Sequence, residues 1–202
     1  MNSTQDAGPE PAAKGGKKAS TGRTILEYVV LAVVAIAVAL LIQAFLVKPY
    51  RIPSESMEDT LLIGDRVLVD RISWRFSDPQ RGDITVFHSP MVGPVLIKRV
   101  IGMPGDEISL KDGAVYVNGS KLDEPYVRTT AEGETVPTQP FDNGLPWSLQ
   151  QPYTVPAGNY FMMGDNRTDS GDSREFGPVP RGQLVGKAFA RYWPPGRIGG
   201  VD

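Results

Sequence analysis

Residues 96–119 read LIKRVIGMPGDEISLKDGAVYVNG, and their pattern indicates the fold class. Short apolar runs in this stretch are separated by Gly, Pro, Asn and Asp, and they occupy residues 96–101, 107–110 and 114–117. Lys111-Asp112-Gly113 and Asn118-Gly119 lie on either side of the third run. Asp-Gly and Asn-Gly pairs are strong short-range signals for hairpin turns. The stretch therefore predicts antiparallel strands joined by tight turns.

The same alternation continues on both sides of this stretch. Further strands are predicted at residues 66–70, 84–87, 160–163 and 184–193. Gly (22) and Pro (18) together make 40 of the 202 residues, a share that favours many short strands over a helical bundle. Residues 120–155 are richer in Thr, Pro, Gln and acidic residues, and they predict a loop-rich excursion. We therefore predict a mainly β fold, with one antiparallel β domain over residues 48–202.

Residues 25–47 differ sharply in composition. Over residues 28–42 the Tyr28 hydroxyl is the only polar side-chain group, and the run matches the roughly 20 residues that span a bilayer core. It is apolar on all sides, unlike an amphipathic surface helix. It is also longer than the apolar core of a cleaved export signal, which is about 7–15 residues. The sequence predicts a single N-terminal transmembrane helix that stays as an anchor, with a cleaved signal or a buried soluble helix as alternatives.

Residues 1–24 predict a disordered tail, because they hold no large apolar residue beyond Met1. Basic residues ahead of the span favour a cytoplasmic N-terminus, and these are Lys14, Lys17, Lys18 and Arg23. Lys48 and Arg51 lie just beyond the span and weaken that preference. With this orientation the β domain lies outside the cytoplasm.

The composition excludes several kinds of site. The chain has no Cys, which excludes disulfides, a thiolate nucleophile and Cys-ligated zinc. His88 is the only histidine, so multi-His metal sites are excluded and a Ser-His-Asp triad is possible only through that residue. A net charge of −2 argues against a globally basic nucleic-acid binder. If the chain is a hydrolase, its general base must be sought elsewhere.

Two serines lie two residues apart in Pro53-Ser54-Glu55-Ser56-Met57, directly after the apolar span. If the segment is extended, the side chains of Ser54 and Ser56 point the same way, because strand side chains alternate. That arrangement would place one hydroxyl able to attack beside another able to donate a hydrogen bond. Taken alone, the segment is better interpreted as a linker or a helix cap, since Ser56 and Asp59 have capping spacing.

Lys98 lies inside a strand-like apolar run. An exposed lysine has a pKa of about 10.4 and is a poor base at neutral pH. Burial disfavours the charged form, and a neutral lysine can take a proton from a serine hydroxyl. The alternative is that Lys98 faces solvent beside Arg99, as a single lysine in a strand usually does.

A polar segment follows the predicted strand at residues 160–163. It runs from Gly164 to Arg174 and contains three acidic and two basic residues besides several hydroxyls. Asp165, Asp169 and Asp172 could offer oxygens to calcium, but their spacing does not match the EF-hand loop. A buried polar network that orients other groups is the preferred interpretation.

Together these segments resemble the type I signal peptidases, which are membrane-bound Ser/Lys proteases. The resemblance covers almost the whole chain from the span onward. It is carried by the anchor, Pro53-Ser54-Glu55-Ser56-Met57, Arg81-Gly82-Asp83-Ile84, Ile97-Lys98-Arg99, Pro104-Gly105-Asp106, the segment from Gly164 through Ser170 and Asp172 to Arg174, and Gly196-Arg197-Ile198-Gly199-Gly200.

Two positions depart from the family pattern. The family often has Gly at position 55 and Pro at position 59, where this chain has Glu55 and Asp59. An extended segment would point Glu55 away from the two hydroxyls, whereas Asp59 puts the local turn in doubt. The short excursion over residues 120–155 implies that the family's accessory β domain is reduced.

The resemblance implies a role for each matching residue. Ser56 would be the nucleophile and Lys98 the general base. The Ser56 backbone N–H and the Ser54 hydroxyl would form the oxyanion hole, and Ser170 would position the lysine amine with support from an Asp172–Arg174 ion pair. Positions that match the family's substrate pockets are Ile52, Met57, Leu61, Val86, Leu96 and Ile97, for which ordinary core packing is an equal alternative. Neither a metal nor another cofactor is implied.

The implied function is cleavage of signal peptides from exported preproteins after a small-x-small motif. The enzyme would act at the outer face of the cytoplasmic membrane through an acyl-enzyme, with the preprotein and the lipid bilayer as partners and no nucleic acid. A membrane-anchored β module that binds peptides without cutting them is the main alternative. A soluble Ser/Lys self-cleaving repressor relative is disfavoured by the span and by the lack of DNA-binding helices.

Overall fold

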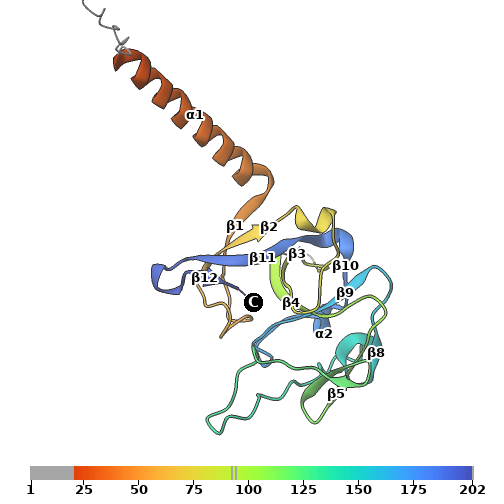
Figure 1. Cartoon of the computed structure of the whole chain (residues 1–202). Helices are drawn as coiled ribbons and strands as arrows, with labels where there is room; N and C mark the ends of the chain where they lie inside the picture. The colour runs from red at the N-terminus through yellow and green to blue at the C-terminus, as the bar shows by residue number, and fades with distance from the viewer. Residues whose placement is uncertain (1–20, 92, 94, 202) are drawn as a thin grey trace, which may run out of the picture. The chain divides into compact units, whose positions relative to one another are not determined.

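The computed structural model describes residues 21–91, 93 and 95–201 of the chain (Figure 1). It contains two compact units, Met1–Leu40 and Leu41–Asp202, which are described separately below. Most of the tail predicted over residues 1–24 lies outside the described residues. Residues 21–24 belong to the first helix.

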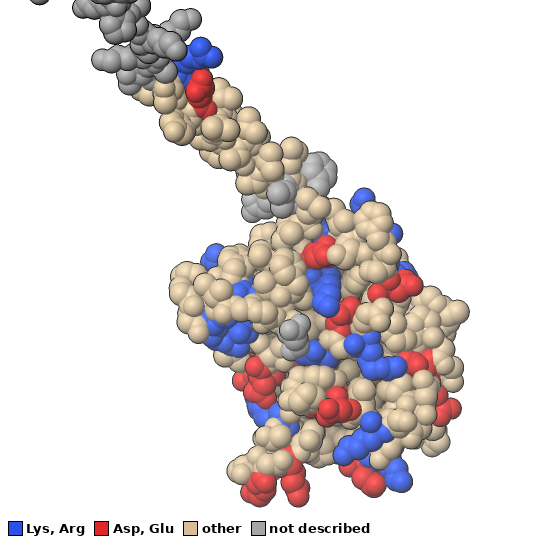
Figure 2. Space-filling view, in the orientation of Figure 1, with Lys and Arg blue, Asp and Glu red and all other residues tan. Residues whose placement is uncertain are grey.

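Helix α1 spans Thr21–Phe45, whereas the sequence predicted the helix over residues 25–47. The stretch Gly22–Leu41 is 20 residues long, and by length and composition it can cross a membrane. Its large apolar side chains are exposed, and Leu26 and Leu31 each expose 63% of their surface. Figure 2 shows the described surface of this helix as uncharged over most of its length. Among the described residues there is therefore one candidate transmembrane helix, and it lies near the N-terminus.

The second unit contains an eight-stranded antiparallel sheet. Seven strands follow the order β1-β2-β11-β3-β4-β9-β10, and β12 pairs with β11. Their bounds are β1 Val47–Arg51, β2 Arg66–Asp70, β3 Ile84–His88, β4 Val95–Gly102, β9 Asn159–Met163, β10 Val179–Pro180, β11 Leu184–Trp193 and β12 Gly199–Gly200. The predicted mainly antiparallel β fold is confirmed.

A smaller sheet has the order β7-β6-β5-β8. Its strands are β5 Glu107–Lys111, β6 Ala114–Val117, β7 Ser120–Lys121 and β8 Tyr153–Thr154. Both predicted hairpin turns are present, with φ of 50° and 76° at Asp112 and Gly113, and of 52° and 79° at Asn118 and Gly119. Successive positive φ values are the signature of the two-residue turn that matches strand twist. Residues 120–155 add only β7, a 3-10 helix (η2, Pro146–Ser148) and β8 as regular elements.

The remaining helical elements are short. They are the α-helix α2 Ser173–Phe176 and the 3-10 helices η1 Ser73–Arg75, η3 Arg181–Gln183 and η4 Pro195–Arg197. Strand β1 was not predicted, and it contains Pro49, which cannot donate to a ladder. It is tolerated because β1 is an edge strand that pairs with β2 alone.

The core connects the two sheets. Ile101 from β4 and Phe161 from β9 pack with Ile108 and Val115 from the smaller sheet. Side chains from the two sheets therefore pack in one apolar cluster. Over the visible face of this unit, basic and acidic side chains are interspersed (Figure 2).

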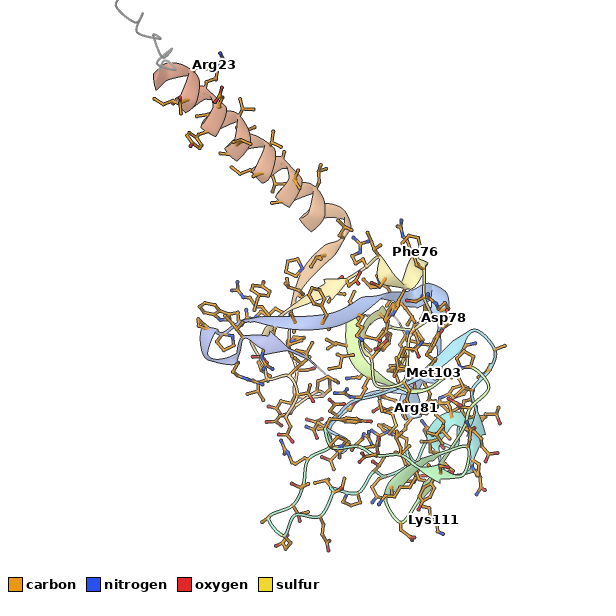
Figure 3. All side chains as sticks on the ribbon, viewed as in Figure 1. Arg23, Phe76, Asp78, Arg81, Met103 and Lys111 are labelled. Atoms are coloured by element: carbon orange, nitrogen blue, oxygen red, sulfur yellow. The ribbon has the colours of Figure 1, made fainter. Side chains whose placement is uncertain are left out.

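The segment Arg81-Gly82-Asp83 leads into β3 and connects it to the end of β4. Arg81 and Met103, both labelled in Figure 3, donate hydrogen bonds to Asp106 Oδ2. The distance is 3.0 Å from the Arg81 guanidinium and 2.6 Å from the Met103 backbone N–H. Arg81 also donates to the Ile101 carbonyl. These contacts fix the ends of β3 and β4, the strand that carries Lys98.

Candidate active site

The segment that carries Ser54 and Ser56 forms a turn rather than the extended strand considered above. The Glu58 N–H donates to the Glu55 carbonyl at 2.8 Å, and the Leu61 N–H donates to the Met57 carbonyl at 2.7 Å. The turn still brings the two hydroxyls together, with 3.4 Å between Ser54 Oγ and Ser56 Oγ. Ser56 is buried, with 7% of its surface exposed. The expected meeting of the hydroxyls is therefore present, but a different local structure produces it.

Lys98 lies in the middle of β4 and is buried, with 3% of its surface exposed. Its Nζ donates a hydrogen bond to Ser56 Oγ. Burial lowers the pKa of Lys98 to about 8, although the nearby carboxylates of Asp172 and Asp165 oppose the shift. The alternative in which Lys98 faces solvent does not hold in this structure. The site can therefore hold a neutral amine next to a serine hydroxyl.

Arg99, the next residue along β4, points into a second buried cluster. Its guanidinium makes two hydrogen bonds to Asp165, at 2.9 and 2.8 Å, and lies 3.9 Å from the centroid of the Tyr126 ring. Thr60 Oγ1 donates to Asp165 Oδ2, which is one of the two oxygens that Arg99 contacts, at 2.5 Å. Thr60 follows the serine turn, so this cluster connects the turn to β4 and to the segment after β9.

Asp172 and Arg174 form the predicted ion pair. The Arg174 guanidinium donates to both carboxylate oxygens of Asp172 at 2.9 and 2.8 Å, and the Gly164 N–H donates to the same carboxylate at 3.1 Å. Burial opposes ionisation of Asp172, but the Arg174 charge and these donors hold its pKa below the ordinary range. Arg174 also donates to the backbone carbonyls of Gln139 and Arg167. The pair thus braces the segment after β9.

Ser170 lies in this segment and is buried, with 6% of its surface exposed. Among the described residues its Oγ has no hydrogen-bond partner, so the bond expected to the Lys98 amine is not formed in this structure. Gly164 lies against both Ser170 and the turn, because a Cβ at this position would collide with Ser170 Oγ and the Ser56 carbonyl. Only glycine lets the two segments approach this closely.

A cavity of about 350 Å³ opens beside the two reactive groups. The described residues that line it are Ser54, Glu55, Ser56, Ser89, Met91, Gly93, Leu96, Lys98, Asp169, Gly171, Glu175 and Phe176. Glu55 is among them, although an extended segment would have pointed this residue away from the two hydroxyls. His88 is exposed at the end of β3 and does not line this cavity.

The six residues predicted to line substrate pockets divide into two groups. Leu96 lines the cavity. The other five are buried in one core cluster, and they are Ile52, Met57, Leu61, Val86 and Ile97. Ile97 is the most exposed of them at 8%. Core packing, the alternative given for these positions, is what this structure has for all five.

Several residues of the site were not identified from the sequence. Asn166 contacts the backbone of the serine turn, and Asp165 pairs with Arg99. Glu175 and Phe176 reach the cavity from α2. The polar run after β9 was the available signal, but the partners lie far apart in sequence, 66 residues in the case of Arg99 and Asp165.

The departure at position 59 has a clear structural counterpart. Asp59 has a φ of 79°, which proline cannot adopt because its ring holds φ near about −65°. Arg128 forms ion pairs with both Glu58 and Asp59, at 2.7 and 3.2 Å. The turn after Ser56 therefore has a conformation that the family's proline would not allow.

Comparison with known proteins identifies one family. The family model for signal peptidase, peptidase S26, matches residues 25–193. A probable signal peptidase I-2 from Synechocystis is 39% identical over 189 residues, which cover 91% of this chain and 80% of that protein. Signal peptidase IB from Staphylococcus aureus strain COL is 37% identical over 175 residues, covering 85% and 91%.

A signal peptidase I from Enterococcus faecalis V583, known from a crystal structure, has 40% sequence identity to this chain and a TM-score of 0.46. The match covers 55% of this chain and 97% of that one. The family match spans most of the chain and both sequence relatives exceed 30% identity over most of their lengths. The chain therefore belongs to the signal peptidase family, peptidase S26, and is a signal peptidase I, a serine endopeptidase of signal-peptide processing.

Proposed function

We propose that Ser56 is the nucleophile and Lys98 the general base of this peptidase. The observation that carries the proposal is the hydrogen bond from the buried Lys98 amine to Ser56 Oγ. With a pKa of about 8, roughly a tenth of Lys98 side chains are neutral at pH 7. At the ordinary lysine pKa fewer than about one in a thousand would be.

In the first step the Ser56 oxygen forms a bond to the scissile carbonyl carbon, and its proton passes to neutral Lys98. The tetrahedral intermediate then collapses, the C–N bond breaks, and the Lys98 ammonium gives its proton to the leaving amine. The result is an acyl-enzyme on Ser56 with Lys98 neutral again. Lys98 next takes a proton from water as the water oxygen attacks the ester carbonyl carbon. When the ester C–O bond breaks, the Lys98 ammonium returns that proton to the Ser56 oxygen, which releases the signal peptide and restores both groups.

The negative oxygen of the tetrahedral intermediate needs hydrogen-bond donors. We assign this role to the Ser56 backbone N–H and the Ser54 hydroxyl, which lies 3.4 Å from Ser56 Oγ. Among the hydrogen bonds of the described residues, none uses the Ser56 N–H, which leaves that donor available to substrate. Ser170, Asp172 and Arg174 are positioning residues in this proposal: Ser170 adjoins the site, and the ion pair holds the segment that carries it.

The substrate is a preprotein whose cleavage site has small residues at the first and third positions before the scissile bond. Met91, Leu96 and Phe176 line the cavity beside Ser56 and Lys98, and their apolar side chains support contacts with small apolar side chains of the substrate. Leu96 therefore remains a pocket residue. Ile52, Met57, Leu61, Val86 and Ile97 act by supporting the site from the core.

The enzyme works at the outer face of the cytoplasmic membrane, with its N-terminus in the cytoplasm. Lys14, Lys17 and Lys18, which precede α1, support that orientation, and anchoring by α1 would put the enzyme in the same bilayer as the apolar segment of its substrate. A module that binds peptides without cutting them would have no need for a buried amine in contact with a buried hydroxyl, since burying either group has a cost.

The full chain in detergent should cleave a preprotein with Ala at positions −3 and −1 at that one bond. Mass spectrometry of the products identifies the bond. A preprotein with Trp at −1 is the matched control, and it should be cut at least about tenfold more slowly, as expected for steric exclusion from a pocket. Binding of the Ala preprotein without cleavage would favour the non-catalytic alternative.

Ser54→Ala should slow cleavage without removing it. Loss of one oxyanion donor typically lowers kcat about 10²-fold or more, and KM should change little because the donor acts on the transition state. Steady-state kinetics on the same preprotein measure both constants. Ser73→Ala, a change on the exposed η1 helix far along the chain, serves as the control. An unchanged kcat in Ser54→Ala would exclude this hydroxyl from the oxyanion hole.

A further inference from the structure

Asn166 holds the peptide units on both sides of Ser56. Its side-chain Nδ2 donates to the Glu55 carbonyl at 3.2 Å, and its backbone N–H donates to the Ser56 carbonyl at 3.2 Å. We propose that Asn166 is a positioning residue that orients and polarises the Glu55–Ser56 peptide, so that the Ser56 N–H serves as an effective oxyanion donor. This inference rests on the proposed function, in which that N–H binds the developing negative charge.

The planar peptide unit couples the direction of the Glu55 carbonyl to the direction of the Ser56 N–H. In a trans peptide the carbonyl and the N–H lie in one plane and point in opposite directions. A hydrogen bond that fixes the Glu55 carbonyl therefore fixes the direction of the Ser56 N–H. A carbonyl that accepts a hydrogen bond also polarises its amide, which makes the N–H a stronger donor, because hydrogen bonds in a chain reinforce one another.

The Asn166 amide is held in the orientation that this role requires. Thr168 Oγ1 donates to Asn166 Oδ1 at 3.1 Å, which leaves Nδ2 facing the Glu55 carbonyl. Asn166 exposes only 9% of its surface, so water competes weakly for the bond. The absence of a side chain at Gly164, two residues earlier, allows this close approach to the Ser56 backbone.

The turn itself does not depend on the Asn166 side chain. The Glu55 carbonyl also accepts the Glu58 N–H at 2.8 Å, and the Asn166 backbone bond to Ser56 is kept by any residue except proline. Removing the side-chain amide should therefore leave the fold and the Lys98–Ser56 contact in place. What it removes is the second bond to the carbonyl of the oxyanion-hole peptide.

Asn166→Ala and Asn166→Asp in the full chain test the proposal. Both are compared with Asn159→Ala, which removes a similar side-chain bond to a backbone carbonyl, Nδ2 to Ala157 O at 2.9 Å, away from the site. Steady-state cleavage of the Ala preprotein is measured at a pH above the Lys98 inflection, so that a changed lysine pKa does not affect the rate. Thermal unfolding and the full pH profile are recorded for each variant.

We expect kcat to fall about tenfold in Asn166→Ala and about 10²-fold in Asn166→Asp, since loss of a whole oxyanion donor sets the upper limit. KM should stay within about twofold of the wild-type value in both variants, because the effect is on the transition state. The inflection of the pH profile should not move in Asn166→Ala. Asp is worse than Ala because a carboxylate has no donor and faces the Glu55 carbonyl with negative charge. A purely packing role predicts the reverse order, since Asp has the size of Asn.

The proposal is overturned if kcat of Asn166→Ala stays within about twofold of the wild-type value, which is far less than the loss of an oxyanion donor costs. It is also overturned if Asn166→Asp is more active than Asn166→Ala. The same assay separates this failure from failure of the proposed function. If the wild type does not cut the preprotein, the function is wrong, whereas an active wild type with an equally active Asn166→Ala contradicts only the role of Asn166.

Discussion

Lys98→Met should lower kcat/KM for preprotein cleavage by at least about 10³-fold, within the range that general acid–base catalysis contributes. Methionine has a similar length and is compatible with a position that is only 3% exposed, so the β4 core should stay packed. The Ser56 hydroxyl then loses the amine that contacts it in this structure. Ser56→Ala, which removes the nucleophile itself, should reduce activity to the same background.

Two further variants distinguish the role of Lys98 as a general base from the effects of its positive charge and of losing a lysine elsewhere in the sheet. Lys98→Arg keeps a positive charge but cannot supply a neutral base, because arginine stays protonated in proteins. It should be as inactive as Lys98→Met. Lys187→Met is the matched control, since Lys187 opposes Thr85 from β11 as Lys98 does from β4, but its Nζ pairs with Asp83 at 2.6 Å. Lys187→Met should retain activity, and activity in either Lys98 variant would contradict the assignment.

Cleavage should rise steeply with pH and then level off. The reactive form of Lys98 is the neutral amine, and burial lowers its pKa to about 8. Below that pKa each unit of pH raises the neutral fraction about tenfold, so kcat/KM should increase about 10³-fold from pH 5 to pH 9. The rate rises with pH, rather than falling, because the base must be deprotonated in the free enzyme. His88→Gln removes the only histidine and should leave the profile unchanged.

Much of the fold was predictable from local signals. The Asp-Gly and Asn-Gly turns around β6 have the positive φ values that their sequence favours. Strands β2, β6 and β11 have the predicted bounds. Strand β1 was missed because Val47–Arg51 contains proline and charge, and its conformation comes from pairing with β2 rather than from its own residues. Long-range pairing of this kind leaves no local signal.

The site was predictable only as a set of segments. Lys98 was a candidate because it interrupts an apolar run, but its partner Ser56 lies 42 residues away in sequence. The expected meeting of Ser54 and Ser56 is present for a different reason, since a turn closed by Glu58 and Glu55 replaces an extended strand. The same turn places Glu55 at the cavity, where an extended segment would have turned it away.

Pocket and core positions could not be told apart from the sequence. Met57 and Leu61 are apolar, as a pocket residue would be, but both are buried in one core cluster with Val67 and Val69 of β2. Leu96 is equally apolar and reaches the cavity. The difference depends on which element packs over each side chain, and this is a property of the tertiary structure. The Asn166 contact was likewise invisible, because its partner is a backbone carbonyl 111 residues away.

The inflection of the pH profile tests the central claim, that a neutral Lys98 activates Ser56, most directly. It is measured as kcat/KM on the Ala preprotein from pH 5 to pH 10, with the full chain in detergent and Lys98→Met as the background. We predict one ascending inflection at about pH 8, where the structure places the pKa of the buried amine. A profile without an inflection, or one that rises only near the ordinary lysine pKa of about 10.4, would contradict the account.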